Sequence, residues 1–397
     1  LKTLKNTQKI TKAMSATFPQ LSELLSSDGL LHLTYGQYSR LWARKWFELE
    51  SKNSLKSYKP KVIHMKKNIL LITTGGTIAS AESQNGLTPT INSKELIKFV
   101  PEINKICSFK TIDLMNLDST NVGPHEWHKI AASVEENYSD FDGFVITHGT
   151  DTLSYTAAAL SYMIQNSSKP IILTGSQKSI YLRDTDARRN LIDAFIYASD
   201  SLSSGVKIVF NSKVIRGTRA RKIRTQSYNA FESIDYPDVA KVISDHVTHY
   251  IIDSVSKEVS FNYRMTHPIF VLKLTPGLNP NMIKTLGNIY KVLIIESFGS
   301  GGLPNVKHSS ECSIRDAIDE FTDNGGIVVL TTQVPHEGSR LATYAVGKSL
   351  TDNPNILEGG LMTLEAIVCK MKWILGQTED PIEIRNLFLK PIDFDII

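Results

Sequence analysis

The segments ITTGGTIAS (Ile72–Ser80) and GFVITHGTDT (Gly143–Thr152) decide the fold class of this chain. Each is an apolar run that ends in glycine and small hydroxyl side chains. A buried parallel strand that carries chemistry at its carboxyl end has this pattern. Each segment also contains a threonine, Thr77 or Thr150, beside a glycine-containing turn. We therefore expect a parallel sheet with a site at its strand ends.

Outward from these segments, strand-like runs alternate with helix-like runs, which is typical of βαβ units and of a doubly wound, mostly parallel sheet. Ser93 is the expected N-cap of the first helix. The alternation predicts strands at 69–73, 109–114, 143–147, 170–174 and 206–211, and helices at 93–99, 126–136, 153–164 and 188–198.

After a less regular stretch at about 225–268, the alternation resumes with strands at 269–274, 292–296 and 326–331 and helices at 313–324 and 362–375. We predict an α/β fold with a larger N-terminal catalytic domain and a smaller C-terminal α/β domain. The expected boundaries are residues 66–254, a linker at 255–268, and residues 269–397.

The composition is that of a globular protein, with 41% hydrophobic and 21% charged residues among 397. No apolar run approaches the ~20 residues of a membrane helix. The first residues lack the apolar segment of a secretory signal, and the three scattered cysteines fit neither a disulfide framework nor a metal pair. We expect a cytoplasmic protein without a membrane partner.

Charge is distributed unevenly along the chain. Residues 1–67 carry 13 basic and 4 acidic side chains, whereas the remainder carries 31 basic and 36 acidic ones. Because the body is mildly acidic, the basic overall charge does not indicate that it binds nucleic acid. We expect the basic leader, residues 1–65, to be helical or disordered. Met65 resembles a start of translation, so an origin foreign to the body is the other interpretation.

The hydroxyl-bearing segments allow two interpretations each. Thr74–Thr77 is either a glycine turn or a close approach to a ligand, and its spacing matches neither common phosphate-binding motif. The Thr150 hydroxyl needs a base to act as a nucleophile. Asp151 is a weak base because its ordinary pKa is near ~4, so a lysine oriented by Asp151 suits the task better. Asp151 also suits the N-cap of the next helix, and His148 suits either a base or a packing role.

Two further segments carry polar chemistry. Asn116–Asn121 (NLDSTN) follows a predicted strand, and it suits either a polar turn or the binding of a small substrate with an amine and a carboxylate. Arg216–Arg224 (RGTRARKIR) is strongly basic and suits a solvated or anion-attracting loop better than a catalytic one.

Together these segments resemble the L-asparaginase family of asparaginase/glutaminase amidohydrolases, from about Met65 to the end of the sequence. The segments Leu114–Asn121, Ala157–Met163 and Tyr228–Ile234 place the resemblance closest to the bacterial cytosolic type I branch. The resemblance implies acyl transfer through a threonine nucleophile. It implies no metal or organic cofactor, L-asparagine as substrate, minor glutaminase activity, and a homodimer or homotetramer.

The resemblance also implies a role for each site residue. Thr77 is the implied nucleophile on a mobile loop, and Thr150, Asp151 and Lys222 are the implied hydroxyl, carboxylate and lysine of a second triad. Asp118 and Ser119 bind the substrate, together with Thr150 and Asp151.

The chain departs from the family pattern at three places. Leu87 stands where many members have a loop tyrosine, Val334 replaces a cysteine near a regulatory site of type I members, and the leader is additional. Two alternatives remain: a D-type component of a tRNA-dependent amidotransferase, which has an extra N-terminal domain, and a non-catalytic amino-acid-binding protein.

Overall fold

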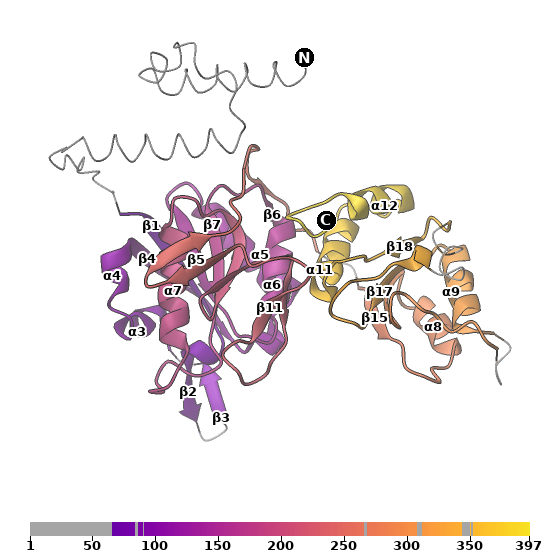
Figure 1. The fold of residues 1–397 in the computed structure, drawn as a ribbon, viewed down its shortest axis with the longest axis horizontal. Coiled ribbons are helices and arrows are strands. Elements are labelled where there is room, and N and C mark those ends of the chain that lie inside the picture. Colours follow the sequence, from indigo (N-terminus) through magenta and orange to yellow (C-terminus); the bar gives the residue numbers. More distant parts are fainter. Residues whose placement is uncertain are drawn as a thin grey trace, which may run out of the picture. The chain divides into compact units, whose positions relative to one another are not determined.

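The computed structural model describes residues 66–83, 86–89, 91–265, 268–307, 312–343, 350 and 352–397. The predicted leader, residues 1–65, lies outside this part of the chain. The described elements build two sheets with helices packed on their faces (Figure 1). The first sheet is the larger and mostly parallel, so the predicted α/β class is confirmed. Among the described residues, no helix is both long and apolar enough to cross a membrane.

The first sheet has eight strands in the order β13-β12-β9-β8-β7-β5-β1-β4. The five strands from β8 to β4 are parallel, and the remaining pairings are antiparallel. The strands are β1 (Asn68–Gly75), β4 (Ser108–Leu117), β5 (Gly143–Thr147), β7 (Pro170–Thr174), β8 (Gly205–Phe210), β9 (Lys213–Arg216), β12 (Ala240–Ile243) and β13 (His246–His249).

Alternation along β1 supplies both faces of this sheet with apolar side chains. Leu70 and Ile72 pack with residues of two helices, α5 (Pro124–Glu136) and α6 (Leu153–Met163). Ile69 and Leu71 pack on the other face, against α3 (Ser93–Lys98), α4 (Ile103–Ile106) and α7 (Ala187–Ser199). Successive strand residues point to opposite faces, which explains why residues 69–72 of β1 are all apolar.

The chain reverses its direction of strand addition between β1 and β5. From β1 the chain adds β4 on one side and then returns to add β5, β7 and β8 on the other. Ligands of doubly wound sheets bind at such a switch point, outside the carboxyl ends of the strands. The strands of Ile72–Ser80 and Gly143–Thr152 both end at this place.

The first residues of two helices differ from what the sequence suggested for their N-caps. Asn92, not Ser93, caps α3, because its side-chain oxygen accepts a hydrogen bond from the Glu95 N–H at 2.9 Å. The Ser93 hydroxyl instead contacts Asp113 at 3.1 Å. Thr152, not Asp151, precedes α6 at the cap position. The Asp151 carboxylate is therefore available for another contact.

The second sheet has four parallel strands, β15 (Phe270–Lys273), β16 (Val292–Ser297), β17 (Ile327–Thr332) and β18 (Ile356–Glu358), in sequence order. Its helices are α8 (Asn281–Gly287), α9 (Ile314–Asp323), α11 (Leu364–Leu375) and α12 (Pro381–Leu389). Three two-stranded ribbons complete the described strands: β2 (Ser80–Ser83) with β3 (Gly86–Pro89), β10 (Ala220–Lys222) with β11 (Phe231–Ser233), and β6 (Ile164–Gln165) with β14 (Ser260–Phe261).

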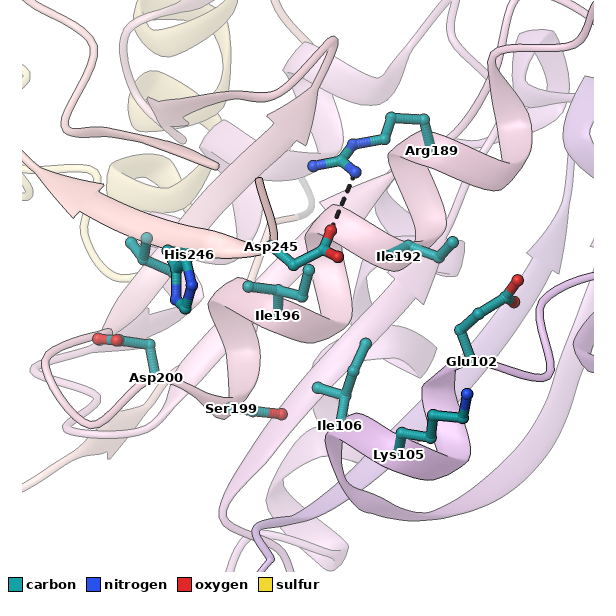
Figure 2. Close-up of a pocket in the computed structure, with 11 residues that line it drawn as sticks. Glu102, Lys105, Ile106, Arg189, Ile192, Ile196, Ser199, Asp200, Asp245 and His246 are labelled. Atoms are coloured by element: carbon teal, nitrogen blue, oxygen red, sulfur yellow. Dashed lines mark hydrogen bonds and ion pairs between the residues drawn. The ribbon is translucent and has the colours of Figure 1, made fainter. Parts of the chain in front are cut away.

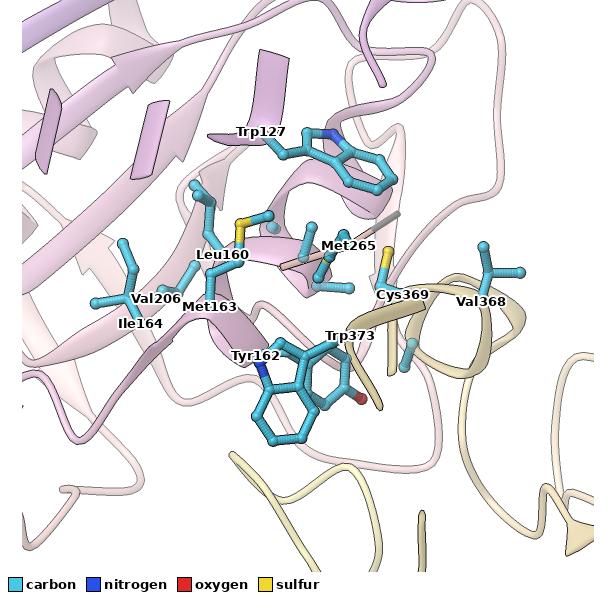
Figure 3. Packing of buried hydrophobic residues seen from close by; sticks show 14 of the residues in the cluster. Trp127, Leu160, Tyr162, Met163, Ile164, Val206, Met265, Val368, Cys369 and Trp373 are labelled. Atoms are coloured by element: carbon cyan, nitrogen blue, oxygen red, sulfur yellow. The ribbon is translucent and has the colours of Figure 1, made fainter. Parts of the chain in front are cut away.

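Helix α11 joins the two sheets by packing against α6, and both helices are almost entirely buried. Figure 3 shows Tyr162 of α6 beside Trp373 of α11, whose rings stack with centroids 6.3 Å apart. The Cys369 thiol donates to the Tyr155 carbonyl at 3.3 Å. The two sheets thus share one apolar core.

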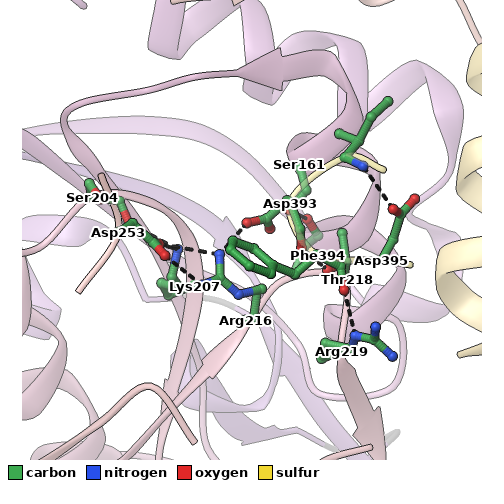
Figure 4. Close-up of polar contacts among 12 residues, drawn as sticks. Ser161, Ser204, Lys207, Arg216, Thr218, Arg219, Asp253, Asp393, Phe394 and Asp395 are labelled. Atoms are coloured by element: carbon green, nitrogen blue, oxygen red, sulfur yellow. Dashed lines mark hydrogen bonds and ion pairs between the residues drawn. The ribbon is translucent and has the colours of Figure 1, made fainter. Parts of the chain in front are cut away.

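Residues 391–397 return to the first sheet, where they meet buried cations of that sheet (Figure 4), and they also meet a buried lysine of α11. Arg216, which is 1% exposed, pairs with Asp253 and, at 2.6 Å, with Asp393. Lys370 pairs with Asp395 at 2.7 Å, and both side chains are fully buried. These ion pairs anchor the last described segment of the chain.

Candidate functional site

The carboxyl ends of three neighbouring strands, β4, β1 and β5, lie close together. A Cβ added at Gly76 would lie 2.4 Å from the Cα of Gly149, and one added at Gly149 would lie 2.6 Å from the Ser119 hydroxyl oxygen. Gly76 also has φ +79°, which L side chains rarely adopt. The glycines therefore let three backbone segments meet at a distance that no other residue allows.

Thr77 begins a 3-10 helix, η2 (Thr77–Ala79), directly after the Gly76–Gly149 contact. The Thr77 side chain is partly exposed, whereas Ile78 and Ala79 are buried and hold the turn in place. The ribbon of β2 and β3 follows at once and carries Leu87 opposite Glu82. Thr77 thus stands at the accessible side of a turn that buried neighbours hold.

Thr150, Asp151 and Lys222 form one hydrogen-bonded group. The Lys222 ammonium donates to the Thr150 hydroxyl at 2.8 Å and to the Asp151 carboxylate at 2.7 Å. The Lys222 side chain is 17% exposed and that of Asp151 is 59% exposed. The Lys222 ammonium thus lies between a hydroxyl and a carboxylate. A lysine needs this arrangement to exchange a proton with the hydroxyl.

The segment before Lys222 is buried, which contradicts its interpretation as a solvated loop. Arg219 donates to the Leu361 and Phe394 carbonyls, both at 2.7 Å, and the Thr218 hydroxyl donates to the Asp393 carbonyl at 2.7 Å. These contacts fix the start of β10, and pairing with β11 places Lys222 opposite Phe231. Lys222 therefore extends from an anchored strand.

Asp118 and Ser119 lie at the end of β4. The Asp118 carboxylate caps the 3-10 helix η3 (Ser119–Asn121) by accepting from the Thr120 N–H at 2.9 Å. The buried Ser119 hydroxyl accepts from the Asp151 N–H at 3.3 Å. The polar-turn interpretation is correct for the backbone, and the same turn places Ser119 against the Asp151 segment.

His148 is a buried support of this site. Its Nδ1 bonds the Gly149 carbonyl at 2.7 Å and its Nε2 bonds the Thr156 hydroxyl at 2.9 Å, which in turn accepts from the Trp127 indole N–H at 3.0 Å. Complete burial lowers the pKa of His148 to about 4, against a smaller opposite effect of the Gly149 bond. A neutral imidazole with both nitrogens occupied has a packing role, not that of a base.

Gln177 is a site residue that the sequence patterns do not reveal. Its side-chain oxygen accepts from the Thr150 hydroxyl at 3.3 Å. It lies three residues beyond β7, the strand next to β5. The rule that strand ends meet at one sheet edge could have directed attention to Gly175–Gln177, but that segment contains neither a strong nucleophile nor a charge.

The six predicted site residues thus gather at one edge of the first sheet. A cavity of about 690 Å³ elsewhere runs along α7, between α4 and the turn joining β12 to β13, and includes none of them (Figure 2). Its walls carry mixed charges, such as the pair of Arg189 with Asp245. Within the described ranges, no three His, Cys, Asp or Glu side chains are grouped so as to hold a metal ion.

Comparison with known proteins identifies relatives over the described body of the chain. A family model named "Asparaginase, N-terminal" matches residues 68–253, and one named "Glutaminase/Asparaginase C-terminal domain" matches residues 268–388. L-asparaginase of Thermococcus kodakarensis is 34% identical over 330 residues, which are 83% of this chain and 98% of that protein.

One further relative and one solved structure extend this comparison. The D-type component of the glutamyl-tRNA(Gln) amidotransferase of Thermococcus kodakarensis is 33% identical over 81% of this chain and 74% of its own length. The solved structure of the thermostable L-asparaginase from Thermococcus kodakarensis matches with a TM-score of 0.77, over 83% of this chain and 99% of that chain, at 34% identity.

Proposed function

Because this chain belongs to the asparaginase family, we propose that it hydrolyses L-asparagine to L-aspartate and ammonia. The observation that carries the proposal is the contact of Lys222 with both Thr150 and Asp151, beside the turn that bears Thr77. An amide hydrolase needs a nucleophile, a proton carrier and donors for the oxyanion, and we assign the first two of these roles to Thr77 and Lys222.

Acyl transfer at this site divides the reaction into two steps. The Thr77 oxygen attacks the side-chain amide carbon, the C–N bond breaks, and ammonia leaves with the proton that the nucleophile gave up. Water then attacks the acyl-enzyme and releases L-aspartate with the Thr77 hydroxyl restored. Backbone N–H groups near Thr77 and Thr150 stabilise the oxyanion, a contribution of about 3 kcal/mol per donor in other enzymes.

The remaining residues bind the substrate and move protons. Lys222, oriented by Asp151, exchanges a proton with the Thr150 hydroxyl. Asp118 and Asp151 accept from the substrate amine, and the Ser119 hydroxyl and Thr150 bind its carboxylate. No metal or organic cofactor enters this scheme. Asparagine is favoured over glutamine, with a difference of about 1–3 kcal/mol for the extra methylene.

The proposal extends to assembly and location. We assign a homodimer or homotetramer in the cytoplasm, with domains at residues 66–254 and 269–397. Support for the location comes from Cys107 and Cys369, which are free thiols buried in the core. Light scattering on the purified protein measures the assembly, and a monomer at micromolar concentration would contradict it.

The decisive test is ammonia release from L-asparagine and L-glutamine, measured by a coupled assay on the full chain. We expect release from asparagine, and we expect Thr77→Ala to lower turnover at least about a thousandfold, because removal of a nucleophile leaves only binding and oxyanion stabilisation. Urea unfolding of the variant controls for its fold. Absence of ammonia from both amides would sink the proposal, and near-normal turnover by Thr77→Ala would remove Thr77 from it.

The relatives of the amidotransferase type support a second candidate, a protein that releases ammonia for tRNA-dependent amidation. A tRNA-binding protein loses affinity steeply as salt rises, because its binding is driven by the release of counterions from the phosphates. Titration of the full chain with tRNA at about 50 and 200 mM salt distinguishes this candidate from a free-standing asparaginase. Tight, salt-dependent binding favours this candidate, and absence of binding favours the free-standing asparaginase.

A further inference from the structure

The side chain of Gln177 connects two halves of the candidate site. Its Oε1 accepts from the Thr150 hydroxyl at 3.3 Å, while its Nε2 donates to the carbonyls of Ser227 at 3.2 Å and Arg224 at 3.4 Å. Arg224 and Ser227 belong to the loop between β10 and β11, two to five residues after Lys222. One amide therefore contacts Thr150 and the segment that carries its lysine.

The surroundings dictate which way the Gln177 amide faces. Two carbonyl oxygens lie on one side of it, and carbonyls only accept, so the NH₂ group must face them. The amide oxygen is then directed at Thr150. The backbone of Gln177 is also held, because its N–H donates to both carboxylate oxygens of Asp186 at 3.0 and 3.1 Å.

The hydrogen-bond roles at Thr150 follow from this orientation. A protonated lysine only donates, so the Thr150 oxygen accepts from Lys222 and its own hydrogen must find another acceptor. Gln177 supplies that acceptor. While Lys222 is protonated, the oxygen lone pairs of Thr150 consequently face Lys222 and its proton faces Gln177.

We infer that Gln177 is a positioning residue of the hydrolytic site. It sets the direction of the Thr150 hydroxyl, and it holds the loop after Lys222 close to Thr150. This inference rests on the proposed function, and it assigns to Gln177 no contact with the substrate. Its effect reaches the reaction through Thr150 and Lys222. Because Thr150 also binds the substrate in the proposed site, we expect a large effect on turnover and a small one on substrate affinity.

Two variants test the role. Gln177→Met keeps the length of the side chain and removes its hydrogen bonds, and we expect kcat to fall roughly tenfold with KM within about twofold. Gln177→Glu keeps an acceptor towards Thr150 but adds negative charge beside Lys222. Because that charge favours the ammonium form, we expect the acidic limb of the kcat–pH profile to move about one unit towards higher pH.

Gln165→Met is the matched control, since Gln165 lies in β6 and its side chain contacts only the Tyr162 carbonyl among the contacts described for it. Wild-type kcat in Gln177→Met, or an unshifted pH profile in Gln177→Glu, overturns the inference. If Gln177→Met fails to fold in urea titrations, the profile of Gln177→Glu decides. An inactive wild-type chain contradicts the proposed function instead, so the two failures are distinguishable.

Discussion

Lys222 differs from its basic neighbours in what its charge contacts. Arg216 is enclosed by Asp253 and Asp393, with the Phe394 ring 4.3 Å from its guanidinium carbon, and Arg219 reaches backbone carbonyls. Lys222 reaches a hydroxyl and a carboxylate at the strand edge. The sequence pattern RGTRARKIR marks all of these residues as basic, and only the fold separates the anchors from the residue of the site.

The buried imidazole of His148 predicts a dependence of stability on pH. Its pKa in the fold is about 4, whereas an unfolded histidine has one near ~6.5. The unfolded state therefore binds more protons below about pH 6.5, so the stabilisation is complete above that pH and is lost as the pH falls towards about 4. We expect this group to remove about 2 kcal/mol of the free energy of unfolding between about pH 7 and pH 5.

The variant His148→Asn isolates that contribution, because carboxylates also titrate in this range. Urea midpoints measured at about pH 7 and pH 5 should fall more for the wild type than for His148→Asn, although the variant is the less stable protein at neutral pH. Equal losses in the two proteins would show that His148 is not buried in its neutral form.

The elements show which parts of the fold a sequence can predict. Long apolar runs such as β5 and β7 lie where the pattern puts them, because a strand buried on both faces has few other uses for such residues. The hairpin of β12 and β13 falls in the stretch that the pattern leaves irregular. Its turn places Ser244 and Asp245 at φ +49° and +64°, a geometry usually signalled by Asn-Gly, and these residues give a weak signal.

The site residues also divide into those that a local sequence pattern predicts and those that it does not. Thr77, Thr150 and Asp118 lie at strand ends, and their position was predictable from strand order. Gln177 depends on contacts between loops far apart in the sequence, which no local pattern records. The N-cap was misplaced for a simpler reason: Asn92 and Ser93 are both good caps, and the two starts differ by one residue.

The close approach of β1 to β5 predicts the effect of a single methyl group. Gly76→Ala meets the Gly149 backbone at 2.3–2.4 Å and has to adopt φ +79°, whereas Gly277→Ala adopts φ +83° with no neighbour within 4 Å. Both variants lose about 1–2 kcal/mol through backbone strain. We expect Gly76→Ala alone to lose further stability and all ammonia release, because β1 and β5 must separate.

Urea unfolding and the coupled ammonia assay on both variants check this difference. Gly277→Ala is the control for backbone strain, so its activity should equal that of the wild type. Equal stability and activity of the two variants would mean that the strand ends can part without consequence for the site.

Across the molecule, a buried ion pair connects helix α11 with the segment that follows α12. Burial lowers the pKa of Lys370, and Asp395, itself fully buried, opposes that shift. Tyr162 of α6 donates to the same carboxylate at 2.9 Å. A buried pair stabilises a fold less than its number of contacts suggests, but removal of one partner leaves an uncompensated charge.

We expect Lys370→Met to lower the free energy of unfolding by about 3–5 kcal/mol, and the double variant Lys370→Met with Asp395→Asn to recover part of that loss. Lys291→Met, which breaks an exposed pair with Glu379, should cost less than about 1 kcal/mol. Urea titrations of the wild type and the three variants measure these differences. A Lys370→Met variant as stable as Lys291→Met would show that the buried pair is not needed.

The anchoring of residues 391–397 also orders events during synthesis. Arg219 and Thr218 donate hydrogen bonds to carbonyls that lie 175 residues later in the chain. A ribosome makes the first sheet long before it makes these partners, and early domains fold as they emerge. The strand that presents Lys222 therefore receives this support only after Asp393 and Phe394 have left the ribosome, so its anchoring is a late event of synthesis.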